Sequence, residues 1–189
     1  TRTAKEVFYM KNNKTKLIAI AGLLIALGTV LSFFHIAISN VMEIRFTSFV
    51  FAVAGYVMGP VWGGVVGAAT DILGWLVRPT GPFFPGFAIS NVVTAFIYAL
   101  FFHKRKVALW RVVVAEAVNM VVVYLILNSL WLSMLYGNGF IALIGARIVK
   151  QLISLPIYAV ATYFLLKMLE KTPVVKTFFV SSKENTADK

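Results

Sequence analysis

The chain has 189 residues, of which 60% are apolar and 13% charged, and its mean hydropathy is +0.85. Soluble domains carry about 25% charged residues, so this composition indicates a single-domain integral membrane protein. The chain has no cysteine, and its two histidines, His35 and His103, lack HExxH spacing, which excludes disulfides, thiolate metal sites and the usual zinc enzymes.

The N-terminal segment, residues 1–16, is polar and basic, and we expect a cytosolic arm. Its five cations are too many and too spread out for the start of a cleaved signal peptide. The first spanning helix is expected at residues 17–34, about long enough to cross a ~30 Å hydrocarbon core. Ala19, Gly22 and Ala26 form one small-residue stripe on it, where either another helix of this protein or a second membrane protein could pack closely.

The segment that follows, residues 35–46, interrupts the hydrophobic pattern with Glu43 and Arg45. It could be an interfacial turn with a local ion pair, or Arg45 could contact a ligand. A short second helix is expected at residues 46–58, because the pair Gly59-Pro60 stops a helix.

A third helix is expected at residues 61–77, and its glycines and alanines leave one side free of bulky side chains, so that another backbone can approach. It also carries Asp71. An acid within a membrane helix costs roughly 2.5–3.5 kcal/mol on insertion scales, so it usually faces a partner or a water-filled cavity. Asp71 therefore indicates a site.

The connection RPTGPFFPGF (residues 78–87) contains three prolines and two glycines. It cannot be helical throughout, because proline lacks the amide donor and restricts the residue before it. Phe83 and Phe84 could form a lid or an aromatic wall there, or could simply anchor the turn at the membrane interface.

Three more helices are expected, at residues 87–102, 108–135 and 140–169, followed by a polar tail from 171 to 189. The predicted fold is therefore an all-α bundle of six transmembrane helices, formed by residues 17–170. Glu116, on the fifth helix, is expected at the cytosolic interface rather than in a cavity.

The distribution of cations predicts the orientation. Five precede Leu17, four lie between Lys104 and Arg111, and five follow from Lys167 onward, whereas the other connections hold only Arg45 and Arg78. The positive-inside rule then places both termini in the cytosol. The net charge of +11 reflects this pattern better than it reflects nucleic-acid binding, since the cations flank spans rather than forming a stripe.

At about 1.5 Å per helical residue, Asp71, Asn128 and Arg147 are expected at similar depth. In the outer half of the bundle cations outnumber acids, which suits an anionic ligand, because arginine binds carboxylates through two parallel hydrogen bonds. Asp71 could accept hydrogen bonds from a polar heterocycle, or could pair internally with Arg78 or Arg147 as a structural bridge. Aromatic side chains could stack on such a ring. The candidate substrate-binding residues are Arg45, Asp71, Trp75, Arg78, Phe83, Phe84, Asn91, Asn128, Trp131, Arg147 and Lys150.

Motifs between residues 23 and 102 resemble the substrate-binding S components of energy-coupling factor (ECF) vitamin transporters. They are LLIALGTVLSFF, EIRF, GYVMGPVWGGVVGAATDILGWL, PTGPFFPGFAIS and IYALFF. The pattern GPxxGxxxGxxxD occurs across several S components, whereas PTGPFFPGF is associated with the folate type. The second half of the chain agrees mainly in helix count and polarity.

The resemblance implies a six-helix bundle in the bacterial plasma membrane that captures a vitamin from outside. It would associate with a membrane scaffold subunit (EcfT-type) and two cytosolic ATPases (EcfA-type), and reorient in the bilayer to release the substrate. The scaffold would dock on the stripe of Ala19, Gly22 and Ala26, with the family's small-residue motif on Gly22 and Ala26. Folate, with a pterin and a glutamate tail, fits an aromatic site with one acid and surplus cations.

We therefore predict a folate-binding S component without a cofactor. Asp71 would bind the pterin edge, and Arg45, Arg78 or Arg147 the carboxylates. The chain lacks a GxxxxGK[ST] phosphate loop, so ATP hydrolysis would take place in partner subunits. The alternatives are an S component for another heterocycle, such as a pterin or a queuosine precursor, and a structural membrane subunit. A membrane hydrolase is disfavoured because Asp71 and Glu116 lie at different depths and no histidine joins them.

Overall fold

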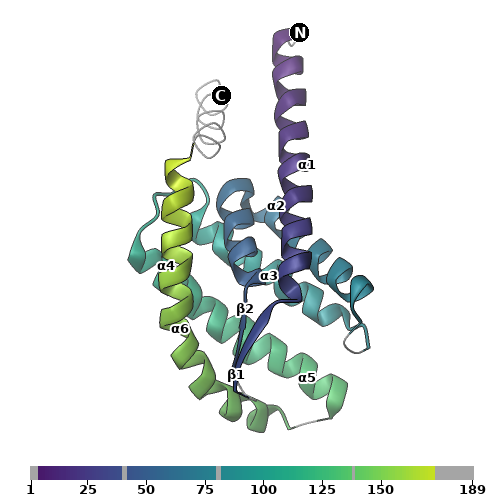
Figure 1. Cartoon of the computed structure of the whole chain (residues 1–189), viewed down its shortest axis with the longest axis vertical. Coiled ribbons are helices and arrows are strands. Elements are labelled where there is room, and N and C mark those ends of the chain that lie inside the picture. The colour runs from purple at the N-terminus through teal and green to yellow at the C-terminus, as the bar shows by residue number, and fades with distance from the viewer. Residues whose placement is uncertain (1–3, 40–41, 80–81, 138, 173–189) are drawn as a thin grey trace.

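Long apolar helices make up most of the chain in a computed structural model, which describes residues 4–39, 42–79, 82–137 and 139–172 (Figure 1). For residues 4–14, 35–39, 42–45, 142, 146 and 150 the description covers the backbone only. The elements in chain order are α1 (Ala4–Ser32), β1 (His35–Ser39), β2 (Met42–Arg45), α2 (Thr47–Val77), α3 (Pro85–Phe102), α4 (Leu109–Asn119), the π-helix η1 (Met120–Leu127), α5 (Asn128–Tyr136) and α6 (Phe140–Lys171).

Within the described residues, five segments are long and apolar enough to cross a membrane. They are Thr15–Ser32, Thr47–Val77, Pro85–Phe102, Leu109–Tyr136 and Gln151–Lys171. Large apolar side chains such as Leu23, Leu100 and Leu152 are exposed on the outside of the bundle, where lipid tails would cover them. The protein is therefore a multi-pass membrane protein.

The element α2 is a helical hairpin, not one straight helix. Gly59 breaks it with φ +82° and ψ −173°, a conformation that glycine adopts at little cost, and Pro60 follows. A Cβ atom on Gly63 would lie 3.4 Å from the Cα atom of Gly55, whereas eight residues of straight helix would separate these positions by about 12 Å. The chain therefore turns back at Gly59, and α2 contains both the second and the third predicted helix.

These two helices, the first half (47–58) and the second half (60–77) of α2, differ in length. The first half extends about 18 Å at 1.5 Å per residue, which is less than the ~30 Å core of a bilayer. Of the five segments of spanning length, α2 folds back on itself and contains two of the six predicted helices, the first of them short as predicted.

Both halves of α2 pack closely on α3. A Cβ atom on Gly55 would lie 2.8 Å from the backbone nitrogen of Ala99, and one on Gly67 would lie 2.7 Å from the backbone oxygen of Asn91. Such distances exclude a side chain at either glycine without a shift of the backbone. The side of the third predicted helix without bulky residues is therefore occupied by α3, as the glycine pattern predicts.

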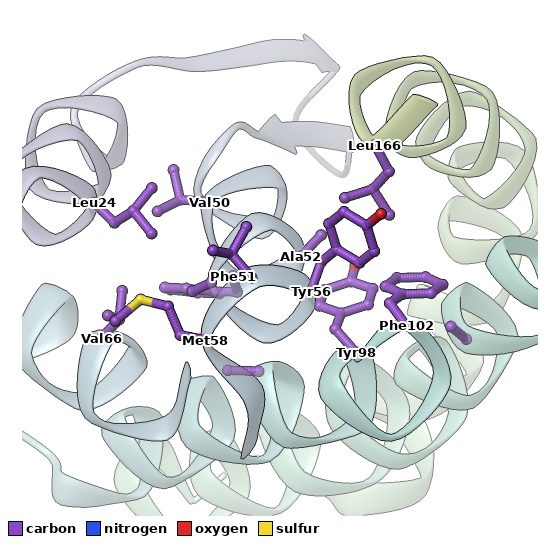
Figure 2. Packing of buried hydrophobic residues seen from close by; sticks show 14 of the residues in the cluster. Leu24, Val50, Phe51, Ala52, Tyr56, Met58, Val66, Tyr98, Phe102 and Leu166 are labelled. Atoms are coloured by element: carbon purple, nitrogen blue, oxygen red, sulfur yellow. The ribbon is translucent and has the colours of Figure 1, made fainter. Parts of the chain in front are cut away.

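The core lies where α2 and α3 meet α6 (Figure 2). Figure 2 shows Tyr56, Tyr98 and Phe102 grouped beside Leu166 of α6, and the rings of Tyr98 and Phe102 stack with centroids 5.7 Å apart. On the other side, α1 lies along the second half of α2, because a Cβ atom on Gly28 would contact Thr70 and one on Gly74 would contact Ser32. The hairpin, α3 and α1 thereby form one packed unit.

The segment after α1 differs from the expected loop, because β1 and β2 pair as an antiparallel hairpin. His35 lies opposite Arg45 and Ile36 opposite Ile44, with an irregularity between Ala37 and Ser39. The hairpin adds two short strands to a chain whose other described elements are all helices, as the predicted all-α class requires. The alternation of isoleucine with smaller or polar residues in HIAIS has the two-residue period of a strand.

Two helices also differ from their predicted form. The helix α1 begins at Ala4 rather than at Leu17, so described residues of the basic arm continue the spanning helix. The predicted fifth helix consists of α4, η1 and α5, with a π-helical stretch at Met120–Leu127. A π-helix is uncommon and often occurs at functional sites. This one leads directly into α5, which begins at Asn128.

The two ends of the bundle carry different connections. The helix α1 begins and α6 ends at the same end (Figure 1), and the connection at residues 103–108 belongs there too, since the amide of Val107 donates to the carboxylate of Glu170 over 3.4 Å. The His103 ring lies against the Gly59 turn, its Nδ1 atom 3.2 Å from the carbonyl oxygen of Tyr56. Arg78, residues 82–84 and Tyr136 line one cavity together with Ser32, the last residue of α1, so they belong to the opposite end.

We expect Gly55→Ala to lower the thermal unfolding midpoint in detergent, because the added methyl group must push α2 away from the backbone of α3. Overpacking of this kind costs about 1–3 kcal/mol. Gly145→Ala is the matched control, because Gly145 is exposed on α6 and its Cβ would meet no atom within 4 Å. An unchanged or higher midpoint is expected there, and equal midpoints for the two variants would contradict the packing described.

Candidate ligand-binding site

A cavity of about 490 Å³ lies among the ends of α1, α2, α3, η1 and α5, on the side of Arg78 and residues 82–84. This volume falls within the range of roughly 300–1,000 Å³ that is usual for small-molecule sites. The predicted site residues that line it are Asp71, Trp75, Arg78, Phe83, Phe84, Asn91 and Asn128. The structure therefore brings together seven of the eleven candidates.

One face of α2 supplies the charged part of the lining. Asp71, Gly74, Trp75 and Arg78 all line the cavity and follow the spacing i, i+3, i+4, i+7, which places them on the same side of the helix. The facing helix α3 has the same spacing in its lining residues, Phe87, Ser90, Asn91 and Thr94. Two antiparallel helix faces thus form adjoining walls.

Asp71 and Asn91 connect these walls. The amide nitrogen Nδ2 of Asn91 donates a hydrogen bond to Oδ1 of Asp71 over 2.9 Å, and both side chains are half-buried. Hydrogen bonds to an ionised group are stronger than neutral ones, so this contact fixes the carboxylate against α3. An acid and an amide held at the same place can accept and donate hydrogen bonds to one planar polar ligand.

Aromatic rings form a second part of the lining. Trp75 packs against Phe83 with ring centroids 5.1 Å apart, and Phe84 packs against Trp131 at 5.7 Å. Trp131 stands behind Phe84 rather than in the lining, and its Nε1–H donates to Oγ of Ser90 over 3.1 Å. Phe83 and Phe84 therefore form an aromatic wall of the cavity, and each ring packs against a tryptophan. This arrangement favours a role in lining a site over the alternative that the two rings only anchor the turn at the membrane interface.

Two buried polar atoms in the lining have no hydrogen-bond partner among the described residues. They are Oγ1 of Thr70 and Oδ1 of Asn128. A buried polar atom without a partner costs about 1–3 kcal/mol, so a bound molecule or an ordered water that reached either atom would recover part of that cost.

The cations predicted to bind a ligand do not all lie at the cavity. Arg78 is exposed and lines it, whereas Arg147 lies half-buried on α6 and is not a lining residue. The backbone of Arg45 ends β2, two residues before the lining residue Thr47, and the side chains of Arg45 and Lys150 lie outside the described residues.

Several lining residues were not among the sequence candidates. They are chiefly hydroxyl-bearing or apolar side chains, including Thr47, Phe51, Thr70, Ser90, Thr94, Tyr124 and Tyr136. Hydroxyl-bearing residues also occur where membrane helices pack against one another without a ligand. Their presence in the sequence therefore does not by itself indicate a binding site. The repeat of polar residues around Asn91 on one face of α3 was the available signal for Ser90 and Thr94.

Glu116 requires a correction. It is only 4% exposed and lies inside the bundle, rather than at the cytosolic interface. Its carboxylate accepts hydrogen bonds from the hydroxyl of Tyr98, 3.0 Å from both oxygens, and from that of Thr162 at 2.8 Å. It is not a cavity-lining residue, so its exclusion from the site is consistent with the structure.

The fold and the cavity define a membrane-embedded protein with an internal small-molecule site. Residues 16–166 match the family model described as "ECF transporter, substrate-specific component". The chain therefore belongs to the substrate-specific components of ECF transporters. This is a family of transporter subunits and not of enzymes, and the resemblance predicted from the motifs is confirmed.

Similar proteins narrow the comparison within that family. The chain is 37% identical over 135 residues to the folate transporter FolT of Clostridium novyi (strain NT), which covers 71% of this chain and 78% of the relative. It is 33% identical over 158 residues to FolT of Leuconostoc mesenteroides subsp. mesenteroides, and this match covers 80% of this chain and 85% of the relative. A crystal structure of FolT bound with folic acid matches with a TM-score of 0.73 and 36% identity, over 80% of this chain and 92% of that one.

Proposed function

We propose that this protein is the folate-binding subunit of an ECF-type importer in the bacterial plasma membrane. The observation that carries the proposal is the hydrogen-bonded pair of Asp71 and Asn91 inside an aromatic-walled cavity of about 490 Å³. The similarity to folate transporters, and to a FolT structure with folic acid, supports the same substrate.

The lining residues match the two chemically different ends of folate. The pterin ring carries N–H donors along one edge, which a carboxylate such as Asp71 accepts in pairs, and its flat faces can stack on the Phe83 and Phe84 wall. The glutamate tail carries carboxylates, which suit Arg78 at the cavity, with Arg45 and Arg147 as further candidates. The ligand would thus bind with its ring inside and its tail towards Arg78.

The orientation follows from the two ends of the bundle. The cations of residues 104–106 lie at the end where α1 begins and α6 ends, and the positive-inside rule assigns that end to the cytosol. Both termini would then be cytosolic, and the cavity would lie towards the outside. Capture from outside and release inside would require the subunit to reorient while bound to its scaffold subunit and two ATPases.

The exposed stripe on α1 supports the scaffold contact. Ala19, Gly22 and Ala26 are all exposed, and a Cβ atom on Gly22 would meet no atom within 4 Å. No described part of this protein packs on the stripe, which favours docking of another membrane protein over internal packing. Small residues allow the close approach of helices on which membrane-protein association depends.

Asp71→Asn should raise the Kd for folate by about 10- to 100-fold, because charge-assisted hydrogen bonds to the pterin are worth about 1.5–3 kcal/mol. Titration of detergent-purified protein, followed by tryptophan fluorescence, measures this. Glu170→Gln is the control, since it removes a carboxylate paired with Lys167 at the other end of the bundle and should leave the Kd unchanged. A native Kd for Asp71→Asn would place the site elsewhere. A native protein that bound riboflavin or thiamine but not folate would refute the substrate.

Arg78→Ala should weaken folate binding by about two- to fivefold, the loss expected for an exposed ion pair, and the loss should shrink at high salt. A folate analogue that keeps the pterin and aminobenzoyl groups but lacks glutamate should bind the variant and the native protein equally. Equal losses for both ligands would show that Arg78 does not bind the tail. If Arg147→Ala alone weakens folate binding, Arg147 is the carboxylate ligand instead.

Gly22→Leu should abolish co-purification with the scaffold subunit and folate uptake by cells, while folate binding to the isolated protein stays native. The bulky side chain covers the stripe without disturbing any contact of Gly22. Gly145→Leu, at an equally open position on α6, should retain both association and uptake. Normal uptake by the Gly22 variant would mean that the scaffold binds another surface.

A further inference from the structure

Four cations and a tryptophan lie where the connection between α3 and α4 enters the membrane-spanning part of the chain. This basic surface consists of Lys104, Arg105, Lys106, Trp110 and Arg111. The three residues of the connection are exposed, Trp110 is 62% exposed and Arg111 is half-buried. The connection belongs to the end of the bundle where α1 begins and α6 ends, whereas the cavity lies at the opposite end. The basic surface is therefore separate from the candidate ligand-binding site.

Contacts with other elements hold the backbone of this connection in place. Val107 is buried, and its amide donates to the carboxylate of Glu170 on α6 over 3.4 Å. Nη1 of Arg111 donates to the carbonyl oxygen of Lys106 over 3.1 Å. Lys104 has φ +58°, a left-handed conformation that is costly for a residue other than glycine and persists only where the surrounding structure imposes it. Charges that served only to direct membrane insertion would not require such a fixed turn.

The described acids do not neutralise the basic surface. The acids whose side chains the structure describes are Asp71, Glu116 and Glu170. Asp71 lines the cavity at the other end, Glu116 is only 4% exposed inside the bundle, and Glu170 pairs with Lys167 over 3.1 Å. None of these three acids forms an ion pair with a cation of the basic surface. Four positive charges at one place without an acid suit an anionic partner.

Arg111 indicates more specifically what kind of anion fits. Its guanidinium lies over the ring of Trp110, 5.3 Å from the ring centroid. Its Nε atom is buried and has no hydrogen-bond acceptor among the described residues. A buried donor without a partner is costly, and Nε together with Nη2 forms the edge of a guanidinium that binds a phosphate or a carboxylate through two parallel hydrogen bonds. An anion at this edge would supply the missing acceptor.

The place of Trp110 and Arg111 along the chain favours a lipid as the source of this anion. Both lie in the first turn of the spanning segment Leu109–Tyr136, at the level where lipid headgroups meet the acyl chains. The neighbouring side chains of Leu109 and Val113 are exposed, as expected for residues that acyl chains cover. Tryptophan is enriched at this level of membrane proteins. A soluble anion would reach the cations of the connection but would leave these apolar side chains without a partner.

We propose that the basic surface binds the phosphate headgroup of an anionic phospholipid, in the leaflet at the end where α1 begins and α6 ends. Arg111 holds the phosphate at its free guanidinium edge, and the ring of Trp110 lies beside the headgroup. The cations of residues 104–106 add the attraction that basic residues exert on an anionic membrane surface. This inference is independent of the solute that the cavity binds.

Quenching of tryptophan fluorescence by brominated lipids tests the proposal. The full chain is placed in phosphatidylcholine nanodiscs in which either a minor component of phosphatidylglycerol or an equal amount of phosphatidylcholine is brominated. The contribution of Trp110 is the quenching that is lost in Trp110→Phe. We expect brominated phosphatidylglycerol to quench Trp110 more strongly than brominated phosphatidylcholine does. Equal quenching by the two lipids in the native protein would overturn the proposal.

Single cations are then removed in matched pairs. Arg105→Gln should lower the preference for phosphatidylglycerol by about two- to fivefold, the effect expected for one basic residue at an anionic membrane surface, and less at high salt. Lys16→Gln is the control, because it removes an exposed cation at the start of another spanning segment, Thr15–Ser32, and should leave the quenching of Trp110 unchanged. Equal effects of the two changes would show that the lipid responds only to the total charge, which contradicts a site at the basic surface.

Arg111→Lys separates a phosphate site from a general attraction between charges. The variant keeps the charge but loses the guanidinium edge, so the preference should fall by about as much as in Arg105→Gln. A native preference in Arg111→Lys would overturn the role of Arg111. The unfolding midpoint shows whether the variant folds. If it does not fold, the double change Lys104→Gln and Arg105→Gln decides the test, since both side chains are exposed.

Inorganic phosphate distinguishes a lipid headgroup from a soluble ligand with the same chemical group. It is added to the nanodiscs at constant ionic strength and at the same concentration as phosphatidylglycerol. We expect the quenching of Trp110 by brominated phosphatidylglycerol to remain, because acyl chains beside Leu109 and Val113 hold the lipid in addition to its phosphate. Loss of the quenching would show that the basic surface binds a soluble phosphate and would overturn the assignment to a lipid.

Discussion

The close contact between the α2 hairpin and α3 is the constraint on which the rest of the structure depends. Gly59 reverses the chain, and Gly55 and Gly67 let backbone meet backbone where any side chain would hold the helices apart. Gly67 lies one turn before Asp71, and its contact is the backbone of Asn91. The same approach that packs the helices therefore brings the two polar side chains within 2.9 Å of each other.

The proline-rich connection between α2 and α3 supplies another part of the cavity lining, which includes Phe83 and Phe84. Because it cannot continue the helix, it leaves α2 after Val77 and enters α3 at Pro85, and in doing so it sets Phe83 against Trp75 and Phe84 against Trp131. Each phenylalanine is held by a tryptophan from a different helix. The aromatic wall consequently depends on the positions of α2 and α5, so a change in their spacing would alter the site without any substitution in the lining.

The sequence predicted those parts of the structure that rest on rare residue types. Glycine spacing predicted the close helix contact, Gly59-Pro60 predicted the break, and an acid in an apolar helix predicted that Asp71 faces a cavity. The strands at residues 35–39 and 42–45 were missed because a short alternation is a weak signal beside charged residues. Glu116 was misplaced because depth along one helix does not reveal which side chains of other helices enclose it. Lining residues such as Thr47, Thr94 and Tyr124 belong to residue types that are also common where membrane helices simply pack together, so the sequence did not single them out.

Two acids of the bundle, Asp71 and Glu116, illustrate how the same group can lie in different surroundings. Glu116 is enclosed by the hydroxyls of Tyr98 and Thr162, so its cost of burial is offset within the protein and it requires nothing from a ligand. Asp71 accepts a hydrogen bond from the amide of Asn91 and lies in the lining of a cavity. A carboxylate in a low-dielectric bundle attracts donors strongly, so the difference in access decides the role. The enclosed acid has its hydrogen-bond donors within the protein, while the acid at the cavity lies where a bound molecule would contact it.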